Sequence, residues 1–239
     1  MNNFKHNEYG AAQKKLIDTI RSNANDRQSA SFVDMVGAYE TDTRLCLTSV
    51  IFPPKSFAEK IVHAVIKPLR SIEPEHFYYS EENLHVTIKN VRVIADPPNF
   101  TPEDIEKADK LFSGIIPRHD AFSFSFGDLV PLPTSASCMG TSDPELGPLV
   151  QELDEGLKRI GLADDKSYFS NSIFLATMTV CRYAKQPSPV FLEKINELSP
   201  INLGQIPARN VCLMRCNAIC SPRTRTIIGS YALHATNAL

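Results

Sequence analysis

The chain has 239 residues, of which 43% are hydrophobic and 22% are charged, and its formal net charge is −2. This is enough apolar sequence for a core in one large domain or two small lobes. The charge excludes a protein that coats nucleic acid over its whole surface, although a local basic groove stays open. The sequence has no apolar run of roughly eighteen residues and no secretory signal, so we expect a cytoplasmic protein without a transmembrane helix.

The first forty residues have the pattern of an extension. Tyr9, Leu16 and Ile20 recur at helical spacing, which predicts a helix over about 8–23. A polar linker follows at 23–31, and the apolar residues of 32–39 are expected to dock on the main body. We therefore expect an N-terminal helical extension at 1–40 and a bilobal domain at 41–239.

Strands and helices alternate from residue 44 onward. Predicted strands cover 45–52, the stretch around His85, 122–126, 135–140, 172–182, 211–220 and 225–233. Predicted helices cover 56–70, 101–117, 144–160 and 188–198. Ser56 and Thr101 are the expected caps of the first two of these helices, and Pro102 supports the second start.

The two halves of this pattern echo one another. Each has a helix, a strand that carries an x-Thr motif, a second helix and a hairpin, which indicates an internal duplication. The predicted fold class is α+β, with two antiparallel sheets lining a central cleft and the helices outside.

The cysteines near the C-terminus look at first like metal ligands. Cys212, Cys216 and Cys220 form an unbroken period-two apolar stripe with Met214 and Ala218, and cysteine behaves as a small buried hydrophobe in such a stripe. There is no Cys-x-x-Cys pair and no nearby histidine to support zinc. We expect no metal and no cofactor.

The stretch Asn83-Leu84-His85-Val86-Thr87-Ile88 is the most informative part of the chain. Strand periodicity puts His85 and Thr87 on one face and the apolar residues between them on the other. An imidazole beside a hydroxyl on a rigid strand can move a proton and hold a phosphate oxygen.

Residues 77–88, FYYSEENLHVTI, resemble the first signature of the two-histidine (2H) phosphoesterase superfamily. That group includes the 2′-5′ RNA ligase-like proteins and the cyclic nucleotide phosphodiesterases. The hairpins at 122–140 and 211–233 are also similar to those of the family, so the resemblance covers about residues 44–233. It implies a bilobal cleft in which two histidines act as general acid and base and two threonines or serines hold the phosphate, without a metal.

The second motif departs from the family pattern. In the stretch ATMTVCR at 176–182, Thr177 stands where the resemblance implies a second histidine, whereas Thr179 and Arg182 fit. A threonine hydroxyl donates a hydrogen bond but cannot shuttle a proton near pH 7, and losing one general acid or base costs about a hundred- to ten-thousandfold in rate. Three alternatives remain open: a one-histidine enzyme, replacement of the lost histidine by a residue such as His76, or a cleft that binds its ligand without turnover.

The resemblance implies His85 as the single imidazole, with Thr87, Thr177 and Thr179 holding the phosphate. The candidate ligand-binding residues are Arg182, Arg215 and Tyr79. Strict alternation puts Arg182 off the threonine face unless the strand ends or bulges. Arg215 alternates opposite the cysteine stripe and is expected to point into the cleft, and Tyr79 is a candidate for stacking on a base.

We therefore expect a 2H-type phosphoesterase-like protein whose cleft takes a cyclic phosphate, a phosphodiester, a nucleotide or an RNA end. Its activity is expected to be weakened or lost, so whether it is an enzyme stays open. The alternative is a catalytically silent protein that binds a nucleotide or RNA end, or an interaction protein whose extension contacts a partner or a second copy. A monomer that does not bind membranes is favoured.

Overall fold

The computed structural model describes residues 6–23, 26–28, 30–164 and 166–235. The helices are α1 (His6–Ser22), α2 (Lys55–Ile61), α3 (Lys67–Arg70), α4 (Pro102–Ile115), α5 (Leu146–Arg159) and α6 (Pro189–Glu197). The strands are β1 (Leu45–Ile51), β2 (Phe77–Tyr78), β3 (Val86–Ala95), β4 (Phe122–Leu132), β5 (Ser135–Ser142), β6 (Ala176–Arg182), β7 (Gly204–Ala208), β8 (Asn210–Cys216) and β9 (Thr226–Ala232). A π-helical turn at 62–66 joins α2 to α3.

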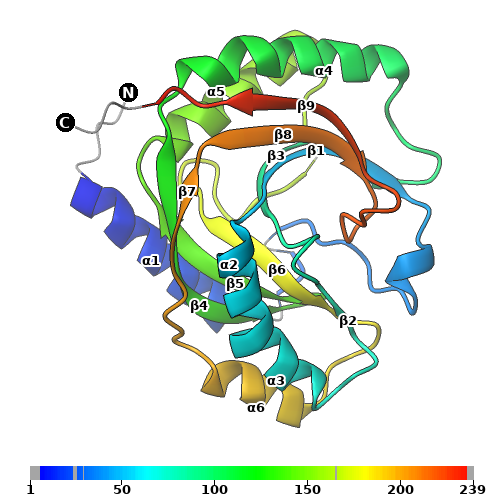
Figure 1. Ribbon diagram of the computed structural model, residues 1–239, viewed down its shortest axis with the longest axis vertical. Coiled ribbons are helices and arrows are strands. Elements are labelled where there is room, and N and C mark those ends of the chain that lie inside the picture. Colours follow the sequence, from blue (N-terminus) through cyan, green and yellow to red (C-terminus); the bar gives the residue numbers. More distant parts are fainter. Residues whose placement is uncertain (1–5, 24–25, 29, 165, 236–239) are drawn as a thin grey trace.

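The strands form two antiparallel sheets. One has four strands in the order β3-β1-β8-β9, and the other has five in the order β2-β6-β5-β4-β7. In Figure 1, α4 and α5 lie above the four-stranded sheet, while α2, α3 and α6 lie in front of the five-stranded sheet. The prediction of an α+β fold with two antiparallel sheets is confirmed.

The main core lies between these helices and the sheets. In β4, Phe122, Phe124 and Phe126 are buried and alternate with half-buried serines, which is the predicted one-face pattern. Phe126 meets Phe57 of α2 with ring centroids 5.6 Å apart. Aromatic and aliphatic side chains of this kind supply most of the free energy of burial.

Helix α1 of the N-terminal extension packs on a face that the sequence does not predict. Its residues Ile17 and Ile20 pack against Val130, Leu132 and Met139 of the β4–β5 hairpin, on the face of the five-stranded sheet opposite α2, α3 and α6 (Figure 1). Those three sheet residues are apolar and need a cover, which the apolar stripe of α1 provides. Helix α1 therefore covers the side of this sheet that the helices of the bilobal domain leave open.

Polar contacts fix α1 at both ends of its packing surface. The side-chain amide of Gln13 donates to the hydroxyl of Ser142 (2.9 Å) and to the carbonyl oxygen of Phe174 (2.6 Å). At the other end, Arg21 forms an ion pair with Asp128 at 2.6 Å. The extension is therefore docked on the five-stranded sheet.

Several predicted boundaries move. Strand β4 continues through Leu132, whereas a turn was expected from Leu129; β6 starts at 176 rather than 172, and β8 ends at Cys216 rather than 220. Strand β7, which pairs with β4, was not predicted. Thr101 forms the expected cap, reciprocated by Asp104, whereas α2 starts at Lys55 and Ser56 does not cap it.

Among the described residues, no helix is long and apolar enough to cross a membrane.

Candidate functional site

In the four-stranded sheet, Thr87 shares a face with the cysteine stripe. The register pairs Val50 of β1 with Thr87 on one side and with Cys212 on the other, and it pairs Cys46 with Cys216. Because directly paired residues point to the same side of a sheet, all of these side chains lie on one face. We call it the threonine face of the four-stranded sheet.

In the five-stranded sheet, Thr177 and Thr179 lie on the face that α1 covers. Thr179 pairs with Ser137, whose hydroxyl lies 3.4 Å from its own, and Thr177 pairs with Met139. Met139 belongs to the apolar cluster under α1. This is the threonine face of the five-stranded sheet.

A β-bulge brings Arg182 onto the same face. The pairing runs from Ser137–Thr179 to Ala136–Cys181, so Val180 is an extra residue, and Arg182 then pairs with Ser135. A bulge of one residue shifts the alternation of every side chain after it. Arg182 therefore faces the same side as Thr179. Strict alternation along the sequence had placed it on the other face unless the strand ends or bulges.

The two threonine faces meet around Arg182. Its Nε donates to the hydroxyl of Tyr79 (2.9 Å) and to the carbonyl oxygen of Ala218 (3.0 Å). The ring of Tyr79 also lies 6.0 Å from that of His85, between centroids. Tyr79 thus joins Arg182 of the five-stranded sheet to His85 at the start of β3, so both faces border one space.

His85 precedes the first residue of β3 and is half-buried. Its Nδ1 lies 2.7 Å from the carbonyl oxygen of Asn83. A carbonyl oxygen only accepts hydrogen bonds, so Nδ1 carries the proton and Nε2 of the neutral ring keeps its lone pair. The ring is thereby oriented to accept a proton, or to bind a donor, at Nε2.

Arg182 has no acidic partner in the described part of the chain. Burial would lower its pKa, but the interactions with Tyr79 and Tyr39 raise the pKa overall, so it stays a cation. The carboxylate of Asp42 is already engaged with Arg44 at 2.9 Å. Arg182 is half-buried, and a cation taken out of water is normally paired, so its terminal nitrogens are open to an anionic ligand.

Cys216 and Cys220 of the cysteine stripe are buried, as predicted, whereas Cys212 is half-buried. The Sγ atoms of Cys46 and Cys216 are 3.8 Å apart. A hydrogen bond with Cys216 lowers the pKa of Cys220 to about 6, burial opposes this, and the charge of Arg225 lowers it further. No group of three His, Cys, Asp or Glu residues in the described ranges is arranged to hold a metal ion.

Two candidate residues do not lie where the sequence suggested. Arg215 pairs with Leu47, on the face opposite Cys46 and Thr87, and its side chain forms a hydrogen bond with Thr226 at the surface. The expectation that Arg215 points into the cleft is therefore wrong, because the cysteine stripe itself lies on the inner face. Tyr79 is 1% exposed, so its ring is not free to stack on a base, and it positions Arg182 instead.

His76 does not stand in for the missing histidine. Its imidazole is buried against Tyr183 and Phe191, Nδ1 accepts from the backbone of Ala184 at 3.3 Å, and Nε2 lies 2.7 Å from the carboxylate of Glu73. The imidazole is thus held inside the protein, although Nε2 and the Glu73 oxygen beside it form no hydrogen bond. His119 and His234 pair with carboxylates elsewhere.

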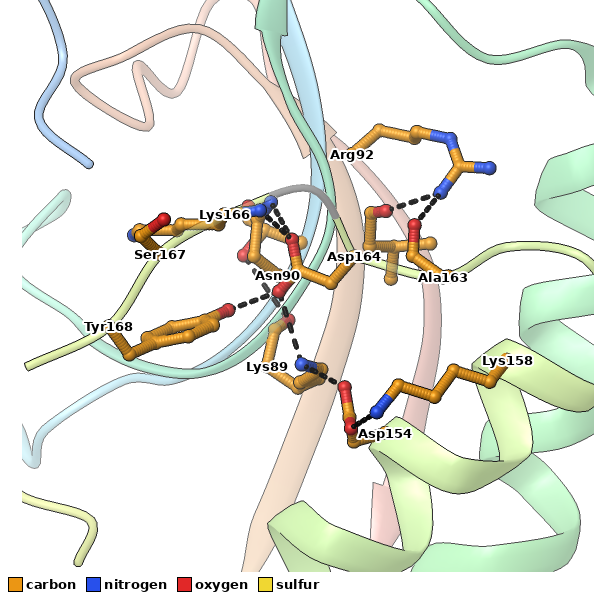
Figure 2. Close-up of polar contacts among 12 residues, drawn as sticks. Lys89, Asn90, Arg92, Asp154, Lys158, Ala163, Asp164, Lys166, Ser167 and Tyr168 are labelled. Atoms are coloured by element: carbon orange, nitrogen blue, oxygen red, sulfur yellow. Dashed lines mark hydrogen bonds and ion pairs between the residues drawn. The ribbon is translucent and has the colours of Figure 1, made fainter. Parts of the chain in front are cut away.

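The loop between α5 and β6 supplies residues that the sequence did not reveal. Figure 2 shows Asp164 accepting from Asn90 and from the backbone of Lys166 with one oxygen, and from Lys89 and Tyr168 with the other. Lys89 also bonds Asp154 at 2.7 Å. The loop has no hydrophobic periodicity, so no sequence signal pointed to it.

Comparison with solved structures identifies the fold. Escherichia coli LigT in complex with 3′-AMP has 20% sequence identity and a TM-score of 0.53, over 80% of this chain and 98% of its own. The TT0787 protein of Thermus thermophilus has 14% identity and a TM-score of 0.55, over 82% of this chain and all of its own. A structure described as a phosphoesterase has 18% identity and a TM-score of 0.53, over 80% of this chain and 99% of its own.

Sequence comparison with protein families and with curated proteins gives no match. At identities of this size the likeness to the solved structures is one of fold, and a fold hosts many functions. The predicted α+β fold is thus confirmed, and it matches that of the LigT and phosphoesterase structures. Roughly a fifth of this chain has no counterpart in those structures.

Proposed function

We propose that this protein binds a phosphate-bearing ligand, a nucleotide or an RNA end, between its two threonine faces, and that its capacity for phosphoester turnover is reduced to what one histidine supports. The observation that carries the proposal is the half-buried cation of Arg182, which is held at Nε and lacks an acidic partner in the described chain. Arginine is well suited to phosphate because its remaining donors form a planar fork.

The neighbouring side chains support the same ligand. Thr87 and Thr179 are half-buried on the two faces, and His85 offers Nε2. Hydroxyls and an imidazole around a guanidinium are suitable partners for phosphate oxygens. LigT has been solved in complex with 3′-AMP, ATP and phosphate, which favours a ligand of this class here.

Turnover would be slow because proton transfer is one-sided. His85 can take a proton from a nucleophile, but Thr177 cannot give one to the leaving oxygen, and His76 is engaged elsewhere. Without the second imidazole we expect a rate about a hundred- to ten-thousandfold below that of a two-histidine site.

Calorimetry with 3′-AMP and a hydrolysis assay with 2′,3′-cyclic AMP test this proposal. We expect Arg182→Lys, which keeps the charge but loses the fork, to weaken 3′-AMP binding at least tenfold. Thr177→His should raise hydrolysis at least a hundredfold, and His85→Ala should remove hydrolysis. His63→Ala, at an exposed helical histidine, is the matched control and should change neither.

The outcomes separate the alternatives. Retained binding with no hydrolysis in wild type or in Thr177→His supports a silent binder. Absence of 3′-AMP binding by wild-type protein, or equal binding by Arg182→Lys of unchanged thermal stability, would contradict the proposed site.

A further inference from the structure

Two cysteine thiols face each other across the four-stranded sheet. Cys46 of β1 and Cys216 of β8 are directly paired in the register, and their Sγ atoms lie 3.8 Å apart. The Cα atoms of directly paired residues in antiparallel strands are about 4.5–5.5 Å apart, within the range of about 4.4–6.8 Å that disulfides span. A bond between these two sulfurs therefore needs a rotation of the side chains and only a small movement of the strands.

The two thiols differ in their access to solvent. Cys216 is 2% exposed, whereas Cys46 is half-buried. A hydrogen bond with Cys216 lowers the pKa of Cys46, and burial opposes this. The thiolate is the form of cysteine that attacks an oxidant, so a small oxidant meets Cys46 first, and Cys216 is the thiol beside it.

Cys220 belongs to the same apolar cluster but is shielded. It is 1% exposed, and its Sγ lies 3.4 Å from the Sδ of Met214. A small oxidant therefore has no direct access to this thiol. The exposed member of the cluster and its directly paired neighbour are Cys46 and Cys216.

The end of β8 leads directly into the contacts that position Arg182. Two residues after Cys216, the carbonyl oxygen of Ala218 accepts hydrogen bonds from Nε of Arg182 (3.0 Å) and from the hydroxyl of Tyr79 (3.1 Å). Any movement of Cys216 is thus carried by two peptide units to the acceptor that holds the guanidinium of the proposed phosphate site.

The next peptide unit of the same loop reaches the histidine. The carbonyl oxygen of Ile219 accepts from the side-chain amide of Asn83 at 3.1 Å, and the backbone carbonyl oxygen of Asn83 holds Nδ1 of His85 at 2.7 Å. The loop after β8 therefore touches the supports of both Arg182 and His85.

We infer that Cys46 and Cys216 form a reversible disulfide, with a hydroperoxide as oxidant, and that this bond weakens binding at the neighbouring phosphate site. The second part of the inference rests on the proposed function. The thiolate of Cys46 attacks one oxygen of the hydroperoxide, the O–O bond breaks, and a sulfenic acid forms with release of an alkoxide or hydroxide. The sulfur of Cys216 then attacks that of the sulfenic acid, the S–O bond breaks, and the hydroxyl leaves as water with the Cys216 proton. The two sulfurs together lose two electrons, which the hydroperoxide gains.

Closure of the bond alters the geometry at the end of β8. The Cβ atoms of directly opposed residues are about 4.5–5.5 Å apart, whereas a disulfide holds them at about 3.5–4.5 Å. Bond formation therefore draws Cys216 toward Cys46, and the thiol of Cys46 gives up its hydrogen bond to the carbonyl oxygen of Cys216 (3.2 Å). The carbonyl oxygen of Ala218 then shifts relative to Arg182, and the guanidinium loses its fixed direction.

Treatment with hydrogen peroxide, followed by peptide mapping with mass spectrometry, tests the disulfide. We expect wild-type protein to give a peptide cross-linked between Cys46 and Cys216 that dithiothreitol releases. Cys212→Ser is the matched control, because Cys212 pairs with Val50 and Ser230 rather than with a cysteine; it should keep the cross-link. Absence of a cross-link in folded wild-type protein, or a cross-link to Cys220 instead, would overturn the inference.

Calorimetry with 3′-AMP tests the effect on the site. We expect oxidised wild-type protein to bind 3′-AMP about tenfold more weakly than reduced protein, as for the weakening of one hydrogen bond of a charged group, and dithiothreitol to restore the affinity. Cys46→Ala cannot form the bond, so peroxide should not change its affinity. Equal affinity of reduced and cross-linked wild-type protein would overturn the regulation. Failure of reduced protein to bind 3′-AMP would overturn the proposed function, whereas the disulfide stands or falls by the mass spectrum.

Discussion

Replacement of Asp164 by asparagine should destabilise the protein more than its size suggests. The Asp164 side chain is 2% exposed and that of Lys89 is 4% exposed. Removing one partner of a buried ion pair costs about 3–5 kcal/mol, because the other charge is left uncompensated. Lys89 keeps a second carboxylate, Asp154, so we expect the lower end, about 3 kcal/mol.

The expected loss is measurable by urea unfolding followed by circular dichroism. For a chain of this size, about 3 kcal/mol corresponds to a fall in Tm of roughly 6–12 °C. Asp154→Asn is the matched control: its side chain is 30% exposed, so we expect a loss of only about 1 kcal/mol. Similar small losses in both variants would refute the view that Asp164 compensates a buried charge.

A double substitution isolates the pair. Lys89→Met removes the buried cation, so adding it to Asp164→Asn should cost less than the sum of the two single losses. An additive result would mean that the two side chains do not interact in the folded protein, contrary to their 3.1 Å separation.

Two further predictions concern the cysteine stripe and the extension. The pKa of Cys220 is lowered to about 6, against an ordinary value of about 8.5, so thiolate absorbance at 240 nm should appear near pH 6 and vanish in Cys220→Ser. The stabilisation from this shift should be complete above the ordinary pKa and lost as the pH falls through 6; absence of thiolate below pH 8 would contradict it. Ile17→Asp places a charge in the cluster under α1 and should expose α1 to limited proteolysis while the sheets stay folded, whereas Lys14→Asp, at an exposed position, should not. Simultaneous cleavage of the whole chain would show that α1 is not a separable unit.

The order of elements was readable from the sequence because apolar periodicity reports which face of each element is buried. The alternation at 122–126 and the cap at Thr101 are examples. What the pattern cannot give is the partner of a buried face. The stripe of α1 predicted a helix, but nothing in it said that the helix docks on the inner face of the five-stranded sheet.

The candidate site was predictable in part, for a similar reason. His85 and Thr87 follow simple alternation. The orientation of Arg182 depends on a bulge, which is set by pairing with β5 rather than by β6 alone, and Arg215 was misassigned because the buried cysteine stripe occupies the inner face. Lys166 and Asp164 lie in an aperiodic loop, and only tertiary contacts bring them to β3.

Because of the bulge at Val180, the number of residues between two motif positions does not by itself determine on which face of the sheet their side chains lie. Thr179 and Arg182 are an odd number of positions apart, and the extra residue restores them to one face. A shorter strand reading Thr-x-Arg, with plain alternation and no bulge, would also present both side chains to that face. Related chains can therefore differ by one residue here and keep the same charge in the same place, so a search that demands one fixed spacing would overlook some of them.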